Sequence, residues 1–488
     1  MIRVSILTLC ALLAGCTVGP DYRPRTAAEL GVPEGYSVPA PATRGDLTRW
    51  WTKFDDPLLA SLVERAAAQN LDVAASIARL RQAREALVQS RSSLLPSING
   101  SAGYNRSENL IGGSSTVTLP DGTITSISRG SGNSFSLGLD AQYQLGLFGE
   151  IRRTVEASRA QYQAAGYDQA AVLVATEAEV ARNYILVRLA QAQLANARAS
   201  LRLQDDNLEI AGFRVDAGLV SSLDREQARS QRAQTAASIP SLEASYNQAV
   251  SRLGVLTGQA PGALKGELAA VAPIPTGPRT VAAGIPADTL RQRPDVLSAE
   301  RALAAATAQI GVAKAALYPA LAISGSIDTN AASLAGIGDA ITGGLFAGLT
   351  QAIFNGGRLR SQVRSQQAAA DGAFLNYRQT VLTALEEVEN AIVALRTAQD
   401  RERAFTTALD AADTTALLAR LQYRNGLTDF ITLNQSESAL LQARNGISQA
   451  RADQATALIQ LYNALGGGWD ATVIPEAPRS TPDIRQDR

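Results

Sequence analysis

Long stretches of the chain place apolar residues three and four positions apart, which is the spacing of an amphipathic helix. The first stretch runs from 150 to 216 without a proline. Six of its apolar residues fall seven apart: Leu173, Val180, Val187, Leu194, Leu201 and Leu208. Five in the second half alternate four and three apart: Val381, Leu385, Val388, Ile392 and Leu395. Such repeats are typical of coiled coils, and the first helix would be about 100 Å long.

Each long helical stretch is interrupted by a short segment that contains glycine. These are DAGLVSSLD, around Gly218, and RNGLTDF, around Gly426. The helical pattern resumes after each interruption, and glycine is the residue that reverses a chain at a helix end most easily. We therefore expect one antiparallel helical hairpin in each half, with tips near 218 and 426.

Four other segments alternate apolar and small or polar residues, which predicts strands. They are 98–104, 134–143, 321–328 and, more weakly, 345–354. Each has about the length of a tilted membrane strand, although alternation alone also fits a soluble sandwich. The segment between the first two is rich in Gly, Ser and Thr, and we expect it to be a long exposed loop.

The chain also repeats itself. The stretch LDVAASIARLRQAREALVQSRSSLLPSINGSAGY, from Leu71, is similar to PDVLSAERALAAATAQIGVAKAALYPALAISGSI, from Pro294. Later segments match at nearly the same offset, so the sequence predicts two copies of one unit: a helix, two strands and a long helical stretch. We assign 16–260 to the first copy, 261–287 to a linker and 288–470 to the second copy.

The two ends of the chain differ from the repeats. Residues 1–15 have a positive start and an apolar run too short to span a bilayer, as in a secretory signal. The run ends in Leu13-Ala14-Gly15-Cys16, which resembles a lipoprotein cleavage site, and this resemblance implies an acylated Cys16 as the first mature residue. A plain signal peptide is the alternative. The tail 471–488 is polar, and we expect it to be flexible.

Composition narrows the possible chemistry. The chain has 488 residues, no histidine, two cysteines and a formal net charge of zero. Without histidine, the usual general base and the usual neutral metal ligand are both missing. The sequence therefore predicts neither an enzyme nor a bound metal or cofactor, and its charge gives no reason to expect nucleic acid as a partner.

Membrane strands would require several copies of the chain. A sheet edge exposed to lipid leaves backbone N–H and C=O groups unpaired, at several kcal/mol each. Four strands are too few to close a barrel, so copies must share one. Two copies give about eight strands and a filled interior, whereas three give about twelve and room for a lumen.

Several motifs resemble the outer-membrane factor family, the TolC-like efflux channels, in its lipoprotein (NodT-like) branch. They are CTVGPDYRP after the signal, RWWTKFDDPLLASLVERA from Arg49, and GIPADTLRQRPDVLSAERALAAATAQIGVAKAALYPALAISGS from Gly284. The resemblance implies a mainly α-helical homotrimer with a twelve-stranded outer-membrane barrel, to which each chain gives four strands. A periplasmic α-helical barrel with an equatorial domain would continue from it. We interpret Trp50, Trp51 and Phe54 as packing residues of the N-terminal segment.

The same resemblance implies partners at the hairpin tips. Channels of this family are passive, and a periplasmic adaptor joins them to an inner-membrane pump, here of the RND type. The adaptor would meet the tip residues of both halves. These are Gly218, Leu219, Val220, Ser221, Ser222, Gly426, Leu427, Thr428 and Asp429.

A closed periplasmic end would need a ring of side chains at the axis. By register from Gly426, the positions facing the lumen would be Ile431, Gln435 and Ser438, with Tyr423 nearby. Relatives often have aspartate and arginine at the second and third positions, so Gln435 and Ser438 argue against a lock made of charges. A lock made by Arg424 and Asp429 across protomers is the alternative.

Three functions remain open from the sequence. The first is the outer-membrane exit channel of a tripartite efflux system for drugs or other small molecules. The second is the exit duct of a type I protein-secretion system, and the third is a structural lipoprotein without a pore. The four alternating segments and the internal repeat favour a pore.

Overall fold

A computed structural model describes residues 17–38, 45–108, 110, 114–128, 132–281 and 283–471. Cys16 and most of the expected tail lie outside these residues. The chain divides into two compact units. The first combines residues up to 23 with 83–162 and 302–374, and the second combines 24–82 and 163–301 with the chain from 375 onward.

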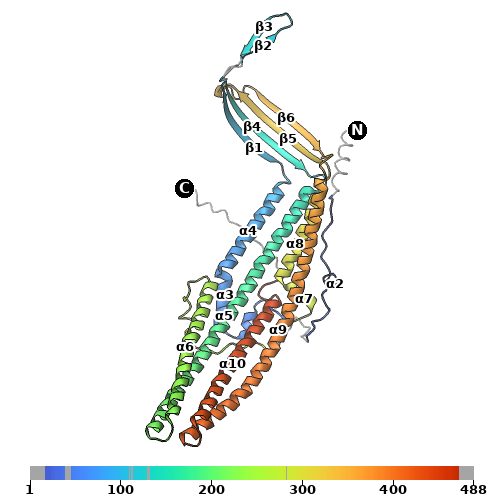
Figure 1. Cartoon of the computed structure of the whole chain (residues 1–488). Coiled ribbons are helices and arrows are strands. Elements are labelled where there is room, and N and C mark those ends of the chain that lie inside the picture. The colour runs from blue at the N-terminus through green and yellow to red at the C-terminus, as the bar shows by residue number, and fades with distance from the viewer. Residues whose placement is uncertain are drawn as a thin grey trace. The chain divides into compact units, whose positions relative to one another are not determined.

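A four-stranded antiparallel sheet dominates the first unit (Figure 1). Its strands are β1 (Ser97–Ser107), β4 (Gly132–Leu145), β5 (Ala320–Ala331) and β6 (Ile341–Thr350), in the order β1-β4-β5-β6. The first three strands are confirmed. The fourth was predicted too late, because β6 pairs from Ile341 opposite Thr329 and ends before the left-handed Gly356 and Gly357.

The expected loop between β1 and β4 contains a hairpin that the sequence analysis missed. β2 (Ser114–Thr118) pairs with β3 (Ile124–Ser128). Gly122 has a φ of 85°, and the Asp121 carboxylate accepts a hydrogen bond of 3.0 Å from the Thr123 N–H. A turn of the Pro-Asp-Gly kind between alternating segments is a known hairpin signal, which the abundance of Gly and Ser obscured.

The helices repeat in length between the two halves, as the internal sequence similarity predicts. α4 (Leu71–Ser92) and α8 (Pro294–Ala315) have 22 residues each. α5 (Glu150–Asp216) and α9 (Arg358–Arg424) have 67 each, and α6 (Ser222–Leu256) and α10 (Phe430–Ala464) have 35 each. Shorter elements are α2 (Ala27–Leu30), η1 (Trp50–Phe54), α3 (Pro57–Gln69), α7 (Pro286–Gln292) and η2 (Leu334–Gly336).

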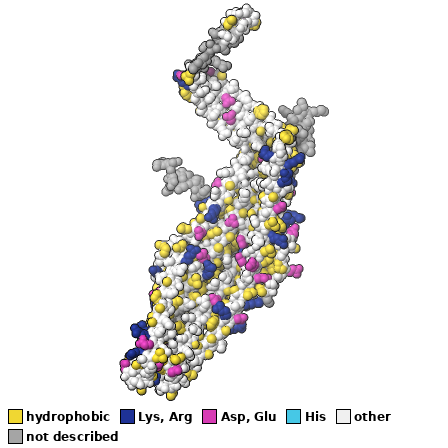
Figure 2. Space-filling model, in the orientation of Figure 1, with side chains coloured by type: hydrophobic (Ala, Val, Ile, Leu, Met, Phe, Trp, Pro, Cys, Tyr) yellow, Lys and Arg dark blue, Asp and Glu magenta, His cyan; other side chains and the backbone are white. Residues whose placement is uncertain are grey.

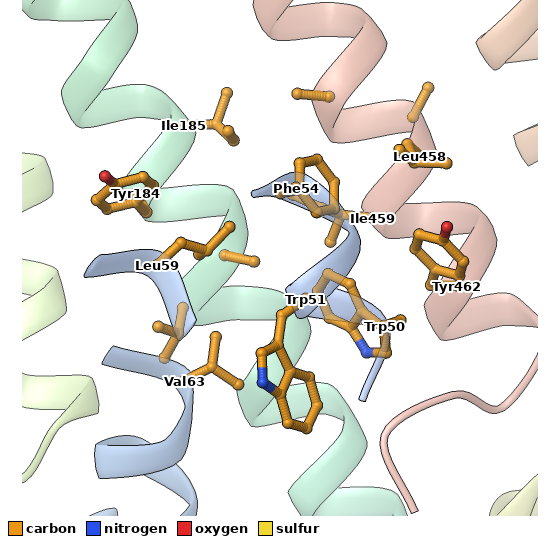
Figure 3. Packing of buried hydrophobic residues seen from close by; sticks show 14 of the residues in the cluster. Trp50, Trp51, Phe54, Leu59, Val63, Tyr184, Ile185, Leu458, Ile459 and Tyr462 are labelled. Atoms are coloured by element: carbon orange, nitrogen blue, oxygen red, sulfur yellow. The ribbon is translucent and has the colours of Figure 1, made fainter. Parts of the chain in front are cut away.

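The core of the second unit forms around η1, as Figure 3 shows. Trp50 is 1% exposed and stacks on Tyr462 of α10, with ring centroids 5.5 Å apart. Leucines and valines of α3 and side chains of α5 complete this core, which includes Leu59, Val63, Tyr184 and Ile185. The packing role expected of Trp50, Trp51 and Phe54 is therefore confirmed.

The segment expected as a linker is not a free spacer, because it packs on the same core. Leu264 and Leu268 are buried, and so are Ile274 and Val281 further along. Arg188 of α5 holds it by donating 2.8 Å to the Ala270 carbonyl. Its apolar side chains thus fix an irregular backbone against the helices.

The helix surfaces are mixed in charge. Figure 2 shows Lys, Arg, Asp and Glu side chains spread along the helices, whereas the strands carry few. Among the residues that the structure describes, no helix combines the length and the apolar character needed to cross a bilayer.

Candidate channel and docking surfaces

The four-stranded sheet has one polar and one apolar face. Residues paired across antiparallel strands share a face, so the register assigns each side chain. Ser101, Gly138 and Asp328 are paired neighbours on one face. The side chains of that face are mostly small, amide or acidic: Asn99, Ser101, Ser136, Asp140, Gln142, Ser324, Ser326, Asp328 and Thr342.

The opposite face is apolar and open. Leu139 lies opposite Ile327 and Tyr104 opposite Phe135, with those two rings 4.9 Å apart. Leu345 is 84% exposed and Leu349 is 64% exposed. Alternation of an exposed apolar face with a polar one, in strands of ten to fourteen residues, is the pattern of a membrane barrel wall.

The sheet also has two open edges. Within the described residues, β1 pairs only with β4, and β6 pairs only with β5. The outward backbone groups of each edge strand therefore lack a strand partner among the described residues. Such edges are satisfied in a bilayer only when another chain continues the sheet.

The two turns at the hairpin ends have the same construction. Gly218 and Gly426 adopt left-handed φ angles of 71° and 73°. Each is followed by an exposed leucine, Leu219 at 70% and Leu427 at 76%. The predicted turns are thus present and expose apolar side chains, although Ser222 already belongs to α6.

Both second helices of the hairpins are capped at the turn. The Ser221 hydroxyl accepts a hydrogen bond of 3.2 Å from the Leu223 N–H. The Asp429 carboxylate accepts one of 2.8 Å from the Thr432 N–H, and hydrogen bonds from the Thr432 side chain and N–H lower the pKa of Asp429. Asp429 therefore has a structural task within its own chain, which competes with a role in a lock.

Tyr423 links the two hairpins and is not part of an exposed row. It is 1% exposed and packs edge-on against Phe430. Arg214 of α5 donates 2.9 Å to the Tyr423 carbonyl, and its guanidinium carbon lies 4.8 Å from the centroid of the Tyr423 ring. The contact fixes one hairpin end against the other.

The other expected gate residues share one outer side of α10. Ile431 is 48% exposed and Gln435 is exposed, while the neighbouring Phe430 and Leu433 are buried in the hairpin core. Ser438 is half-buried, and its hydroxyl accepts a hydrogen bond of 3.5 Å from the Gln231 amide of α6. Ile431 and Gln435 are thus available to another chain or to a lumen.

The sequence analysis missed a buried acidic residue near the same end. Glu437 of α10 is 7% exposed and accepts 2.7 Å from the Asn207 amide of α5. Its other oxygen accepts 3.1 Å from the Arg420 Nε of α9. A carboxylate that joins three helices stabilises their arrangement, and only the helical spacing from Leu433 could have suggested that Glu437 points inward.

Arg293, in the motif from Gly284, has a similar joining role. It is 7% exposed and bonds both oxygens of Asp295 at 2.6 and 3.0 Å. It also donates 2.6 Å to Glu387 of α9 and 2.9 Å to the Ala464 carbonyl of α10. This charged residue therefore connects the start of α8 to the second hairpin.

The acidic side chains of the described residues do not form a metal-binding cluster. In the described part of the chain, no three or more Cys, Asp or Glu residues gather in a way that could hold a metal ion. The acidic residues named above are instead engaged with arginines and backbone amides.

Comparison with known proteins agrees with this arrangement. The family model "Outer membrane efflux protein" matches residues 62–259 and 285–467. Nodulation protein T of Rhizobium leguminosarum bv. trifolii is 32% identical over 475 residues, which cover 94% of this chain and 96% of that protein. The pyoverdine export outer membrane protein OpmQ of Pseudomonas aeruginosa is 30% identical, covering 96% and 98%.

The fold agrees as well. The solved structure of the outer-membrane channel OprN superposes with a TM-score of 0.82 and 33% identity, covering 93% of this chain and all of that one. Each matched range of the family model contains two strands of the four-stranded sheet and one helical hairpin. With its two-faced sheet, open edges and paired hairpins, the chain belongs to the outer membrane efflux protein family.

Proposed function

We propose that this chain is the outer-membrane exit channel of a tripartite efflux system. The observation that carries the proposal is the four-stranded sheet with one polar face, one exposed apolar face and two unpaired edges. Three copies joined through β1 and β6 give a twelve-stranded barrel with its polar faces toward a lumen. The long helices would continue the duct into the periplasm.

The second unit supports an assignment to an equatorial region. The N-terminal segment around Trp50, the linker with Leu264 and Leu268, and the end of α10 all pack on one core. We place this region midway along the helices in the periplasm. In this proposal the channel is passive, and the pump supplies the energy for transport. The described residues of the channel contribute groups that pack and form hydrogen bonds.

The proposed partners are a periplasmic adaptor and an inner-membrane pump of the RND type. The exposed Leu219 and Leu427 beside left-handed glycines give each tip a small apolar surface suited to an adaptor's helical tip. The named cargoes of the relatives differ, so the cargo here follows from the pump and not from the chain. OpmQ, for example, carries pyoverdine export in its name.

A photo-crosslinker at the tip tests this function. If Cys16 is acylated and Cys10 leaves with the signal, Thr428→Cys provides the only reactive thiol of the mature chain. We expect it to capture an adaptor that belongs to an efflux pump. Thr407→Cys, exposed on α9 away from the turn, is the control and should capture none.

The other outcomes identify the alternatives. Capture of a type I secretion adaptor from Thr428→Cys would move the function to protein export. Capture of nothing, with the protein trimeric in the outer membrane, would contradict the tripartite assignment and leave a lone pore or a scaffold.

We also propose that Cys16 carries lipid and adds membrane affinity to a barrel that is already anchored. Each buried methylene of an acyl chain adds about 0.8 kcal/mol. Thr17 follows Cys16, and it is not the aspartate that retains many lipoproteins at the inner membrane. Cys16→Ser with an ordinary cleavable signal should keep partial efflux activity, and complete loss at normal trimer levels would contradict this.

A further inference from the structure

We propose that a cavity at the junction of strands and helices in the first unit binds one acyl chain of the lipid on Cys16. The inference rests on the proposed lipidation and gives the lipid a specific seat in the protein. The residues directly after Cys16 are held against the protein by several contacts.

The N-terminal segment is docked against the start of α5. The Val18 N–H donates 3.2 Å to the Phe148 carbonyl. Gly149 has a φ of 85°, and a Cβ at this position would lie 2.2 Å from the Thr17 Cγ2. Glycine is therefore required for Thr17 to lie directly on the backbone that joins β4 to α5.

Further contacts fix the direction of the segment. At Gly19 an added Cβ would lie 2.5 Å from the Cα of Gly311 in α8, so the two backbones touch. Asp21 then pairs with Arg153 of α5 at 2.6 Å, and the Arg153 side chain is 6% exposed. The segment is thus held over several residues, and the place of Thr17 is set by packing and not by chance.

The cavity opens beside the residue to which Val18 is bonded. It has a volume of about 450 Å³, and its apolar lining includes Leu145, Leu147, Phe148, Ala315, Tyr318 and Ala352. The Phe148 and Tyr318 rings stack with centroids 4.6 Å apart and form one wall. The lining also includes Glu150, Thr350 and Gln351, which suit the polar linkage at the head of an acyl chain.

Chain geometry brings the lipid to this cavity. Cys16 directly precedes Thr17 in the sequence, and consecutive Cα atoms lie about 3.8 Å apart. Phe148 accepts the Val18 hydrogen bond through its backbone and lines the cavity, so the docked segment ends at the cavity wall. The apolar part of this lining lowers the free energy of an acyl chain packed on it, because the methylenes in contact with it leave water. The occupant is therefore the chain's own lipid.

Photo-crosslinking of the intact trimer tests the seat. Cells are fed a diazirine fatty acid that is incorporated into lipoproteins, and crosslinks from the Cys16 peptide are mapped by mass spectrometry. We expect crosslinks to residues 145–150, 315–320 and 350–352. Ala316→Trp, at an exposed position of the cavity lining, should reduce them at least tenfold. Ala347→Trp, exposed on β6 and outside the lining, should leave them unchanged.

Stability gives a second readout. Lipidated trimer should melt at a higher temperature than the Cys16→Ser trimer, and Ala316→Trp should abolish this difference. Crosslinks confined to the apolar strand face, equal occupation of the cavity by phospholipid in the Cys16→Ser trimer, or an unmodified Cys16 peptide would each overturn the inference. Efflux through the same variants is measured separately, so failure of the seat and failure of the channel function are distinguishable.

Discussion

Buried polar side chains hold the second unit together at the scale of single residues. Arg188 of α5 is 4% exposed and donates to the Tyr184 hydroxyl, to Gln191 and to the Ala270 carbonyl. Tyr184 in turn donates 2.6 Å to Asp56 at the start of α3. One guanidinium thus joins a helix, the linker and the N-terminal segment.

Removal of this guanidinium should be costly. We expect Arg188→Ala to lower the free energy of unfolding by about 2–4 kcal/mol, because it leaves buried acceptors without a donor. The control is Arg198→Ala, which removes an exposed ion pair with Glu243. This change should lower the free energy of unfolding by about 1 kcal/mol or less. Denaturant midpoints of both variants measure the difference. Equal midpoints would contradict the role of Arg188.

Glu177 of α5 should make stability depend on pH. It is 2% exposed, its Oε2 has no hydrogen-bond partner among the described residues, and burial raises its pKa from 4.5 to about 9. Between these values the folded state keeps a proton that the unfolded state releases. The contribution of Glu177 to the free energy of unfolding is therefore fully present below about pH 4.5, and it is lost as the pH rises toward 9.

Glu177→Gln should remove this dependence. We expect its free energy of unfolding to vary less between about pH 5 and pH 8 and to exceed that of the parent at pH 8 by on the order of 2 kcal/mol. Glu226→Gln, exposed on α6, is the matched control and should keep the parent's slope. Identical slopes for Glu177→Gln and the parent would contradict a protonated Glu177.

At the scale of elements, each strand of the sheet has one apolar and one polar face. Neighbouring residues of β4 allow the two faces to be compared directly. Leu137 is on the apolar face and Ser136 is on the polar face. Leu137→Arg should lower the yield of folded trimer in the outer membrane, because an arginine facing lipid costs about 2–4 kcal/mol near the bilayer centre. Ser136→Arg should be tolerated. Equal yields would contradict the assignment of the faces.

The first turn of α10 carries Ile431, which we propose narrows the lumen of the closed channel. Ile431 is exposed there, whereas Tyr423 is buried and Asp429 caps the helix. We expect Ile431→Ala to raise single-channel conductance and antibiotic entry, because it widens a neutral ring. Asp429→Asn keeps a capping side chain and should change neither. Unchanged conductance in Ile431→Ala would place the narrowing elsewhere, and increased conductance in Asp429→Asn would favour the alternative lock.

Periodicity explains how much of these elements the sequence could predict. Val381, Val388 and Leu395 are buried as their spacing requires, and β1, β4 and β5 follow their alternation. Contacts between distant segments leave no such local signal. The charge of Glu177 suggests a surface residue of α5, but Gly468 packs on it with no room for a side chain. The turn at Gly122 had a signal that was overlooked.

The whole molecule depends on contacts that one chain cannot make for itself. Each half supplies two strands of the four-stranded sheet and a hairpin, and their repetition gives a sheet whose edges are open in the described residues. The resemblance to a known family supplied the number of copies and the partners. The open edges of β1 and β6 therefore provide the decisive test of how many copies close the sheet.

Disulfide crosslinking between the edge strands tests the account most directly. The mature chain has no other free thiol if Cys16 is acylated, so cysteine pairs with one member on β1 and one on β6 can be scanned in the outer membrane. The account predicts a ladder of monomer, dimer and trimer that ends at the trimer, for pairs that share a face. A ladder that continues beyond the trimer, or no crosslink between chains for any pair, would contradict a channel closed by three copies.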